Sequence, residues 1–293
     1  MHEKILIVGA VRNVEKTILQ DVLNFSLAFK KFDPHFFLVE SDSSDATLEK
    51  LDVLRKKLTK FEYASLGNLI PTYTKRTERL AACRNFYLEL IKNEKLYPEA
   101  GLVCVADFDN VNRLINSSSL EWLSIPKDWD VCTANTNQVY FDIFALRHGT
   151  HNNSCPKKNE RFYSKIGKTC LQAKYLSSWS KMIHIPSNVD WIRVRSAFGG
   201  CSIYKRSSFK DARYSGLDKH GNEVCEHVYL HDQICRSGGK IYIVPSFVTT
   251  GWTLHSLPAH RISKIIISIV LWVETLLSID FLQLIRFLRP RRR

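Results

Sequence analysis

The sequence predicts an α/β fold with a mostly parallel central sheet flanked by helices. Short apolar segments of strand length alternate with longer segments whose apolar residues recur at helical spacing. Polar residues that cap helices or form turns follow the apolar segments. Because 45% of the 293 residues are hydrophobic, the chain can also form a sizeable core.

The alternation is clearest before residue 110. We expect strands at residues 4–8, 35–39 and 101–106 and helices at 14–30, 48–58 and 75–93. Gly9 ends the first strand, and the polar segment 40–47 precedes the second helix. Strands and helices that alternate in this way form a parallel, doubly wound sheet, in which ligands bind at the carboxyl ends of the strands.

The second half of the chain is less regular. Residues 148–185 contain few periodic apolar positions, which indicates a mobile loop or lid. Beyond this segment we expect a strand or turn around Gly199 and Gly200, followed by a helix at 225–236 and a strand at 240–244.

The C-terminal segment is both apolar and basic. Residues 262–288 carry apolar side chains at a period close to that of a helix, interrupted by charges such as Glu274 and Asp280. No uncharged run reaches about 18 residues, so a membrane span is not expected. The basic residues that follow favour an amphipathic helix on an anionic membrane surface. The alternative is a terminal helix docked on the domain.

Charge and cysteine content limit the class of protein further. A net charge of +13 suits a polyanionic partner, but no RNA-binding or helix-turn-helix signature is present, so we expect no nucleic acid partner. The eight cysteines form no CxxC pair and no disulfide framework, which indicates a reducing compartment. Residues 1–9 lead directly into a strand and are too short for a secretory signal. We therefore expect a cytoplasmic protein, peripheral on the cytosolic face of a membrane.

The most informative segment is 102–110, a short apolar run that ends in Asp107 and Asp109. Residues two apart on a strand share a face, so both carboxylates would lie together at the strand's carboxyl end. Two hard oxygen ligands predict a site for a divalent cation together with a diphosphate. The alternative is an ordinary turn in which Asp and Asn bond their own backbone and Phe108 is held in the core.

Further candidates for binding a nucleotide diphosphate lie near the ends of the first two strands and in the third helix. The base, ribose and phosphate of a nucleotide would lie near Arg12, Glu40 and Asp42. Helix capping is the alternative for Glu40 and Asp42. Arg79 and Arg84 add positive charge for a departing diphosphate. Arg84 lies among apolar residues, where a guanidinium needs a partner.

A second group of polar residues occurs in the helix at 225–236. Glu226 is predicted to bind the substrate that accepts the transferred group, or to act as a base on it, with His227 or His231 beside it. A solvated helix face is the alternative, and the two histidines lack the order of an HExxH zinc motif. His255, beyond the last strand, is a candidate third metal ligand.

Several of these segments together resemble a known family. The first strand, the loop from Glu40, the acidic pair, the Gly199-Gly200 turn and the Glu226 helix resemble the ordered landmarks of GT-A-fold glycosyltransferases. Residues 79–85, 142–147, 197–204 and 225–228 more narrowly resemble the cryptococcal capsule-associated mannosyltransferase-like group, which is family 69-like. The resemblance covers residues 4 to 255.

The resemblance implies a GT-A, Rossmann-like fold and a hexosyltransferase activity. The enzyme would move a sugar, mannose in the named group, from a GDP- or UDP-sugar to a glycan or lipid-linked acceptor in surface polysaccharide synthesis. Asp107 and Asp109 would bind Mn²⁺ or Mg²⁺ and the diphosphate. The catalytic domain would comprise residues 1–256, with a donor half at 1–110 and an acceptor half at 111–256, followed by a membrane-associating helix at 257–293.

Two other functions fit part of the sequence. A nucleotidyltransferase also uses paired acids and a metal but attacks phosphorus, and it would normally have a glycine-rich basic loop after the first strand. Residues 9–12 match such a loop only weakly. A non-catalytic basic module for membrane or nucleic acid is supported by charge alone.

Overall fold

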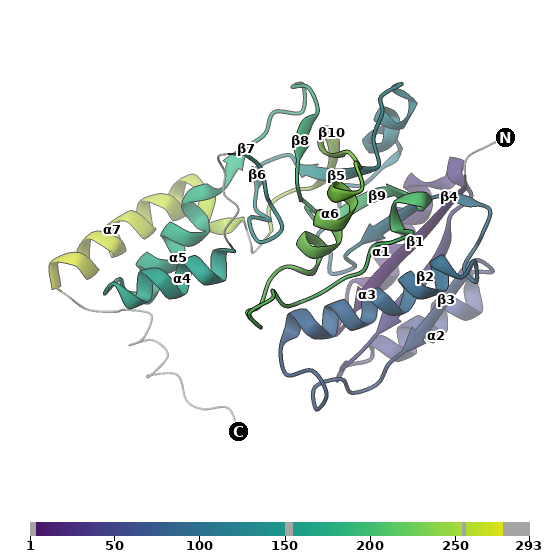
Figure 1. Cartoon of the computed structure of the whole chain (residues 1–293), viewed down its shortest axis with the longest axis horizontal. Coiled ribbons are helices and arrows are strands. Elements are labelled where there is room, and N and C mark those ends of the chain that lie inside the picture. Colours follow the sequence, from purple (N-terminus) through teal and green to yellow (C-terminus); the bar gives the residue numbers. More distant parts are fainter. Residues whose placement is uncertain (1–3, 150–154, 254–255, 278–293) are drawn as a thin grey trace.

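The computed structural model of the chain describes residues 4–149, 155–253 and 256–277 (Figure 1). Its centre is a sheet with the strand order β3-β2-β1-β4-β9-β5-β10-β8. Within these described residues, β8 and β9 run opposite to the other strands of this sheet, so the sheet is mostly parallel as predicted. Helices cover both faces, which confirms the predicted α/β fold class.

The strands of this sheet are β1 (Lys4–Val11), β2 (His35–Glu40), β3 (Phe61–Ser65), β4 (Ala100–Ala106), β5 (Val131–Thr136), β8 (Ile192–Val194), β9 (Cys201–Lys205) and β10 (Ile241–Thr250). Two short strands, β6 (Val139–Tyr140) and β7 (Ile183–His184), pair separately. The α-helices are α1 (Ile18–Ala28), α2 (Thr47–Lys57), α3 (Arg76–Lys92), α4 (Pro156–Lys165), α5 (Cys170–Ser177), α6 (Glu226–Arg236) and α7 (Arg261–Leu277). The 3₁₀ helices are η1 (Lys30–Phe32), η2 (Ser117–Ser124), η3 (Trp179–Lys181), η4 (Arg206–Phe209) and η5 (Leu257–Ala259).

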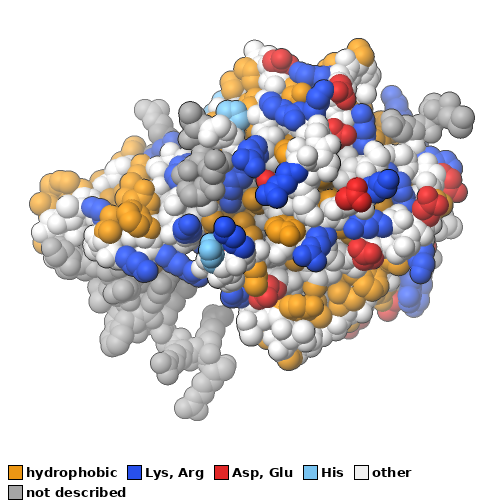
Figure 2. Space-filling model, viewed as in Figure 1, with side chains coloured by type: hydrophobic (Ala, Val, Ile, Leu, Met, Phe, Trp, Pro, Cys, Tyr) orange, Lys and Arg blue, Asp and Glu red, His pale blue; other side chains and the backbone are white. Residues whose placement is uncertain are grey.

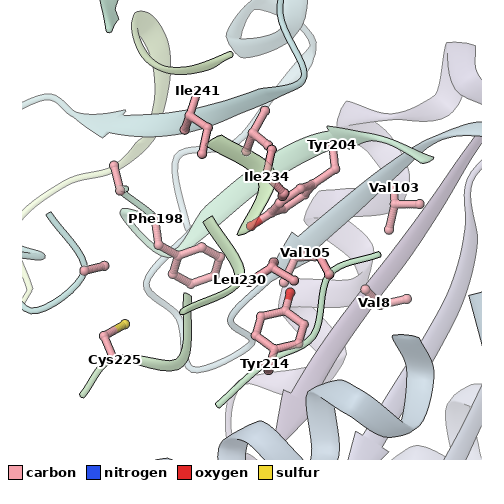
Figure 3. Packing of buried hydrophobic residues seen from close by; sticks show 14 of the residues in the cluster. Val8, Val103, Val105, Phe198, Tyr204, Tyr214, Cys225, Leu230, Ile234 and Ile241 are labelled. Carbon is pink, nitrogen blue, oxygen red and sulfur yellow. The ribbon is translucent and has the colours of Figure 1, made fainter. Parts of the chain in front are cut away.

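Alternate residues of β1 pack on opposite faces of the sheet. Ile5 and Ile7 belong to a core shared with α1 and α2, whereas Leu6 and Val8 belong to a core shared with α3 and α6. Figure 3 shows Val8 and Leu230 of α6 within the second core. Because both faces are buried, this strand has the continuous apolar sequence expected of a central parallel strand.

The predicted strands and helices before residue 110 are confirmed with shifts of their ends, as are the helix at 225–236 and the strand at 240–244. The prediction that Gly9 ends the first strand is wrong, because β1 continues through Gly9 to Val11 and pairs with β2 there. Strand β5 was not predicted, although all its residues are buried, and neither was strand β3. Strand β3 lies at the edge of the sheet, and Phe61 is its one buried residue. A strand with one buried position has no apolar run for the sequence to display.

The prediction of a loop for residues 148–185 is wrong for the part that the structure describes. Residues 155–182 form α4, α5 and η3, which pack with η5 and α7 to give the helical lobe, defined as residues 155–182 and 256–277 (Figure 1). Helix α5 begins with a capping box between Thr169 and Gln172. The sequence of α4 is too polar to display an apolar period, because this helix covers other helices and not the sheet.

The predicted amphipathic C-terminal helix is present as far as Leu277, and residues 278–293 lie outside the described ranges. In the ranges described, no helix has the length and apolarity needed to cross a membrane. Helix α7 packs on the start of α5, where the Thr169 hydroxyl donates a hydrogen bond to Oε2 of the buried Glu274 at 2.5 Å.

Candidate active site

A cleft of about 580 Å³ lies over the carboxyl ends of β1, β2 and β4, where a ligand is expected in such a sheet. The predicted site residues that line it are Arg12, Asp42, Arg79, Arg84, Asp107, Asp109, Glu226 and His227. Glu40 lies outside the lining, and His255 lies outside the described residues. The structure thus brings together residues from five segments that are far apart in the sequence.

The acidic pair lies in a loop and not on a strand, because β4 ends at Ala106. The predicted sharing of a strand face is therefore wrong, although both carboxylates line the cleft. Phe108 is buried between them, and its carbonyl accepts a hydrogen bond from the Thr17 hydroxyl at 2.9 Å. Burial of this ring directs Asp107 and Asp109 to the cleft.

Gly200 fixes the start of the same loop. Its carbonyl accepts hydrogen bonds from the Asp107 amide at 2.9 Å and from the Asn112 side chain at 2.8 Å. Its φ of 89° favours glycine, and an added Cβ would lie 2.9 Å from the Val111 side chain. The predicted turn at Gly199-Gly200 thus positions the acidic loop.

Asp21 of α1 supports the other end of the loop. It is buried, and its carboxylate accepts a hydrogen bond at 2.9 Å from the amide of Asn110, whose φ is 67°. Burial raises the pKa of Asp21 to about 6, although the Asn110 hydrogen bond lowers it. The folded state therefore binds a proton more tightly than the unfolded chain between about pH 4 and pH 6, and stability falls as the pH rises through that window.

We expect Asp21→Asn, which keeps the acceptor oxygen, to raise the free energy of unfolding at pH 7.5 by about 1–3 kcal/mol. The carboxylate charge that burial disfavours is absent from this variant. The advantage should disappear at pH 4, where Asp21 is protonated in the folded state. Urea unfolding at both pH values measures the effect, and an equal change at pH 4 and pH 7.5 would contradict this assignment.

Arg84 joins the acidic loop to α6. Its side chain is buried; Nε donates to Oε1 of Glu226 at 3.0 Å, and one terminal nitrogen donates to Oδ1 of Asp107 at 3.2 Å. The guanidinium also lies 5.2 Å from the centre of the Phe198 ring. The partner that the apolar surroundings of Arg84 required is thus a pair of carboxylates. Asp107 bonds Arg84 and not its own backbone, unlike the side chains of an ordinary Asx turn.

Several carboxylates share this cleft. Removal of water raises the pKa of Asp107 to about 7; Arg84 lowers it, and Asp109, Glu226 and Asp142 raise it further. Burial also raises the pKa of Asp142, whose oxygens accept hydrogen bonds from the amides of Gly199 and Ala145. The carboxylates thus lie where a cation would relieve their mutual repulsion.

His227 lies next to Glu226 at the start of α6. Its ring stacks on Phe198 at 3.8 Å between centroids, and neither ring nitrogen has a hydrogen-bond partner among the described residues. Burial lowers its pKa well below the ordinary value, with Arg84 and His231 lowering it further, so the ring is neutral. His231 is different: its nitrogens lie 3.0 Å from the Ser196 hydroxyl and 2.8 Å from the Tyr204 hydroxyl. It is a paired core residue.

In the loop after β2, one carboxylate oxygen of Asp42 is also buried without a hydrogen bond. Oδ1 of Asp42 accepts hydrogen bonds from the Leu69 and Ile70 amides, whereas Oδ2 has none among the described residues and lies 3.6 Å from Nε of Arg79. Arg12 donates to the Asp42 carbonyl at 3.1 Å and is exposed at the edge of the cleft.

Glu40 supports this loop from below. Its carboxylate accepts hydrogen bonds from the Ser43 amide at 2.9 Å and the Ser65 hydroxyl at 2.5 Å. The residue is buried and holds β2, β3 and the loop together. These contacts give Glu40 a structural role, in line with the helix-capping alternative.

Sequence reasoning missed several charged and aromatic residues that line the cleft, among them Arg76, Asp142, Lys174 and Trp179. Asp142 begins one of the segments on which the resemblance rested, which was a usable signal. Arg76 shares a helix face with Arg79, which was another. Lys174 and Trp179 belong to the helical lobe, and no signal for them existed once the segment was interpreted as a loop.

Asp107 and Asp109 are the residues that could hold a divalent cation. In the described part of the chain, no group of three or more His, Cys, Asp or Glu side chains is arranged to bind one. Mg²⁺-like ions that arrive with a diphosphate usually need only one or two carboxylates, because phosphate and water oxygens complete the coordination. The donor set therefore fits Mn²⁺ or Mg²⁺ bound together with a diphosphate.

No family model matches the chain, and no curated protein sequence matches it. Mannosyltransferase PcManGT from Pyrobaculum calidifontis in complex with GDP-Man and Mn²⁺ is 12% identical over 94% of this chain and 65% of that chain, with a TM-score of 0.48. TarS 1–349 from S. aureus in complex with UDP-GlcNAc is 14% identical over 85% and 58%, with a TM-score of 0.49. GalNAc-T7 with UDP, GalNAc and Mn²⁺ is 14% identical over 87% and 45%, with a TM-score of 0.48. The chain thus spans 45 to 65% of the length of these solved structures.

Proposed function

We propose that this chain is a metal-dependent GT-A glycosyltransferase that moves a sugar from a nucleotide diphosphate sugar to an acceptor in surface glycan synthesis. The observation that carries the proposal is the Asp107–Arg84–Glu226 chain of ion pairs in a cleft at the carboxyl ends of parallel strands. On this proposal Asp107 would belong to the site for a cation and a diphosphate, Arg84 would supply a buried positive charge, and Glu226 would be the carboxylate on the acceptor side.

The donor would lie along the β1 and β2 ends of the cleft. Oδ2 of Asp42 is buried without a hydrogen bond, so it can accept one from a hydroxyl or amine of the nucleoside. Arg12 and Arg79 add charge for the diphosphate. Asp107 and Asp109 would hold Mn²⁺ or Mg²⁺, which when bound neutralises charge on the departing diphosphate.

Glu226 is the candidate base. Its Oε1 accepts from Arg84, and Oε2 has no hydrogen-bond partner among the described residues, so Oε2 can accept the acceptor's hydroxyl proton. In a direct displacement, that hydroxyl oxygen bonds to the anomeric carbon. The bond from this carbon to the diphosphate breaks, and its electron pair stays on the diphosphate. The neutral His227 offers ring nitrogens for orienting either substrate.

A thermal-shift screen of GDP-, UDP- and dTDP-sugars tests donor binding. Only a donor that binds the folded state raises the melting temperature, and a concentration of 100 times the Kd stabilises by about 2.7 kcal/mol. We expect one nucleotide class to raise the melting temperature with Mn²⁺ present and to lose most of this effect with EDTA. The same screen with Asp42→Ala should show a smaller shift. No shift with any donor would contradict donor binding.

The location that we propose is the cytosolic membrane surface. The basis is the amphipathic α7 together with the basic sequence beyond it. Flotation with anionic vesicles should be lost when the chain is ended before Arg261. Unchanged flotation would favour a helix that only docks on the domain.

A further inference from the structure

The helical lobe connects the cleft to an exposed apolar surface. Lys174, Trp179 and Pro258 of this lobe line the cleft. The same lobe carries α7, which is held against α5 by the hydrogen bond between Thr169 and the buried Glu274. One packed unit therefore contributes residues to the cleft lining and also carries α7. Figure 1 shows α7 at the outer side of this unit.

Helix α7 presents a continuous apolar stripe away from Glu274. The side chains of the stripe are 55 to 65% exposed, and they are Ile262, Ile265, Ile266, Ile269, Trp272, Leu276 and Leu277. They recur at the spacing of one helix face. Exposed apolar surface of this extent marks an interaction site. Figure 2 shows hydrophobic side chains gathered at the end of the lobe, with Lys and Arg side chains nearby.

The charge of the lobe indicates which partner covers the stripe. Residues 155–182 and 256–277 contain nine Lys or Arg and two Glu, so the lobe carries a net +7 of the chain's +13. A second copy of the chain would bring another +7 against this surface, which is unfavourable. Anionic lipid head groups complement the charge, and exposed Ile and Trp side chains suit the membrane interface.

Lys174 extends this positive charge into the cleft. Its ammonium lies 5.2 Å from the centre of the Trp179 ring and has no acidic partner among the described residues. Arg76 of α3 also lines the cleft and has no hydrogen bond or ion pair in the part of the chain described. Both cations are exposed and thus available to an anionic group on an incoming molecule.

We propose that the acceptor is a membrane-anchored lipid with an anionic head group, which enters the cleft along the helical lobe. This inference rests on the proposed glycosyl transfer. The stripe of α7 lies on the anionic membrane, and Lys174 and Trp179 contact the head group. Because one rigid lobe would contact both the membrane and the acceptor, it would keep the acceptor side of the cleft next to the bilayer. A lipid acceptor would then not have to leave the bilayer completely.

The test uses the full chain and vesicles of phosphatidylcholine with phosphatidylglycerol. The acceptor probe in those vesicles is a polyprenyl diphosphate that carries one sugar, because its head group offers both a sugar hydroxyl and an anionic diphosphate. A soluble oligosaccharide in the same mixture is the competing acceptor. The variant Ile265→Ser/Ile269→Ser/Trp272→Ser changes the stripe. The matched control is Leu19→Ser/Leu23→Ser/Leu27→Ser, which changes three exposed leucines of α1. Three readouts are flotation with the vesicles, transfer of labelled sugar to the lipid, and donor hydrolysis without vesicles.

We expect the stripe variant to lose flotation and to transfer at least about tenfold less sugar to lipid, with donor hydrolysis within about twofold of wild type. The α1 control should keep all three readouts. Stripe-variant flotation and lipid transfer equal to wild type would overturn the inference, as would label in soluble oligosaccharide but none in lipid. A wild-type chain that hydrolyses no donor but still floats would instead contradict the proposed function.

Discussion

The double variant Asp107→Asn/Asp109→Asn is expected to lose donor hydrolysis and sugar transfer by at least about 10³-fold. Both carboxylates line the cleft, and together they supply the oxygen ligands for a cation bound with a diphosphate. An amide binds a divalent cation more weakly than a carboxylate and does not neutralise its charge. Release of nucleoside diphosphate in the presence of Mn²⁺ measures the loss.

The fold of this variant should be kept, which separates the loss of activity from unfolding. Partial burial in the cleft raises the pKa of Asp107 to about 7, so its charged form is disfavoured in the folded protein. A neutral Asn should therefore leave stability unchanged below about pH 4, where Asp107 is protonated in both the folded and the unfolded state, and raise it at pH 6 and above. The exposed Asp211→Asn is the matched control and should keep full activity. Full activity of the double variant would contradict the assignment.

Arg84→Met is expected to lower the free energy of unfolding by about 3–5 kcal/mol. Arg84 and Glu226 are both buried, with 3% and 5% of their side chains exposed, and loss of the guanidinium leaves Glu226 as an uncompensated buried charge. The second variant Arg84→Met/Glu226→Gln should recover at least half of the lost stability, because it also removes that charge. Urea unfolding at pH 7.5 measures both.

The matched control for Arg84 is Arg55→Met, which breaks an exposed ion pair with Asp52 on α2. Exposed pairs contribute about 0–1 kcal/mol, so this variant should be close to wild type. If Arg84→Met were as mild as Arg55→Met, the three-residue ion-pair chain would not be a buried unit. The same result would remove the physical link between the acidic loop and α6.

The sequence was informative about elements whose residues pack directly on the sheet. β1 and β4 display apolar runs because both of their faces are buried, and the segment after β4 ends in the acids that reach the cleft. It was uninformative about the helical lobe, whose α4 is mostly polar and packs on other helices. Periodicity alone did not predict α5, although the capping-box residues at Thr169 and Gln172 were a signal in the sequence for the start of this helix.

The candidate site could be predicted only in part, because its residues come together from distant parts of the sequence. The need of Arg84 for a partner followed from its apolar neighbours, but Glu226 is 142 positions away and could be identified only once the fold was known. Glu40 illustrates the converse error. Its position after β2 suggested a ligand contact, whereas its hydrogen bonds to Ser43 and Ser65 make it a support for the loop.

The most direct test of the central claim is to identify the products that the full chain forms from nucleotide substrates with Mn²⁺. Glycosyl transfer breaks the bond between the anomeric carbon and the diphosphate, so at least one GDP-, UDP- or dTDP-sugar should yield nucleoside diphosphate. This yield should disappear in Asp107→Asn/Asp109→Asn. In a nucleotidyltransferase the acceptor attacks the α-phosphorus of a nucleoside triphosphate, takes the nucleoside monophosphate group and releases pyrophosphate. Release of pyrophosphate in this way, with no nucleoside diphosphate from any sugar donor, would contradict the account.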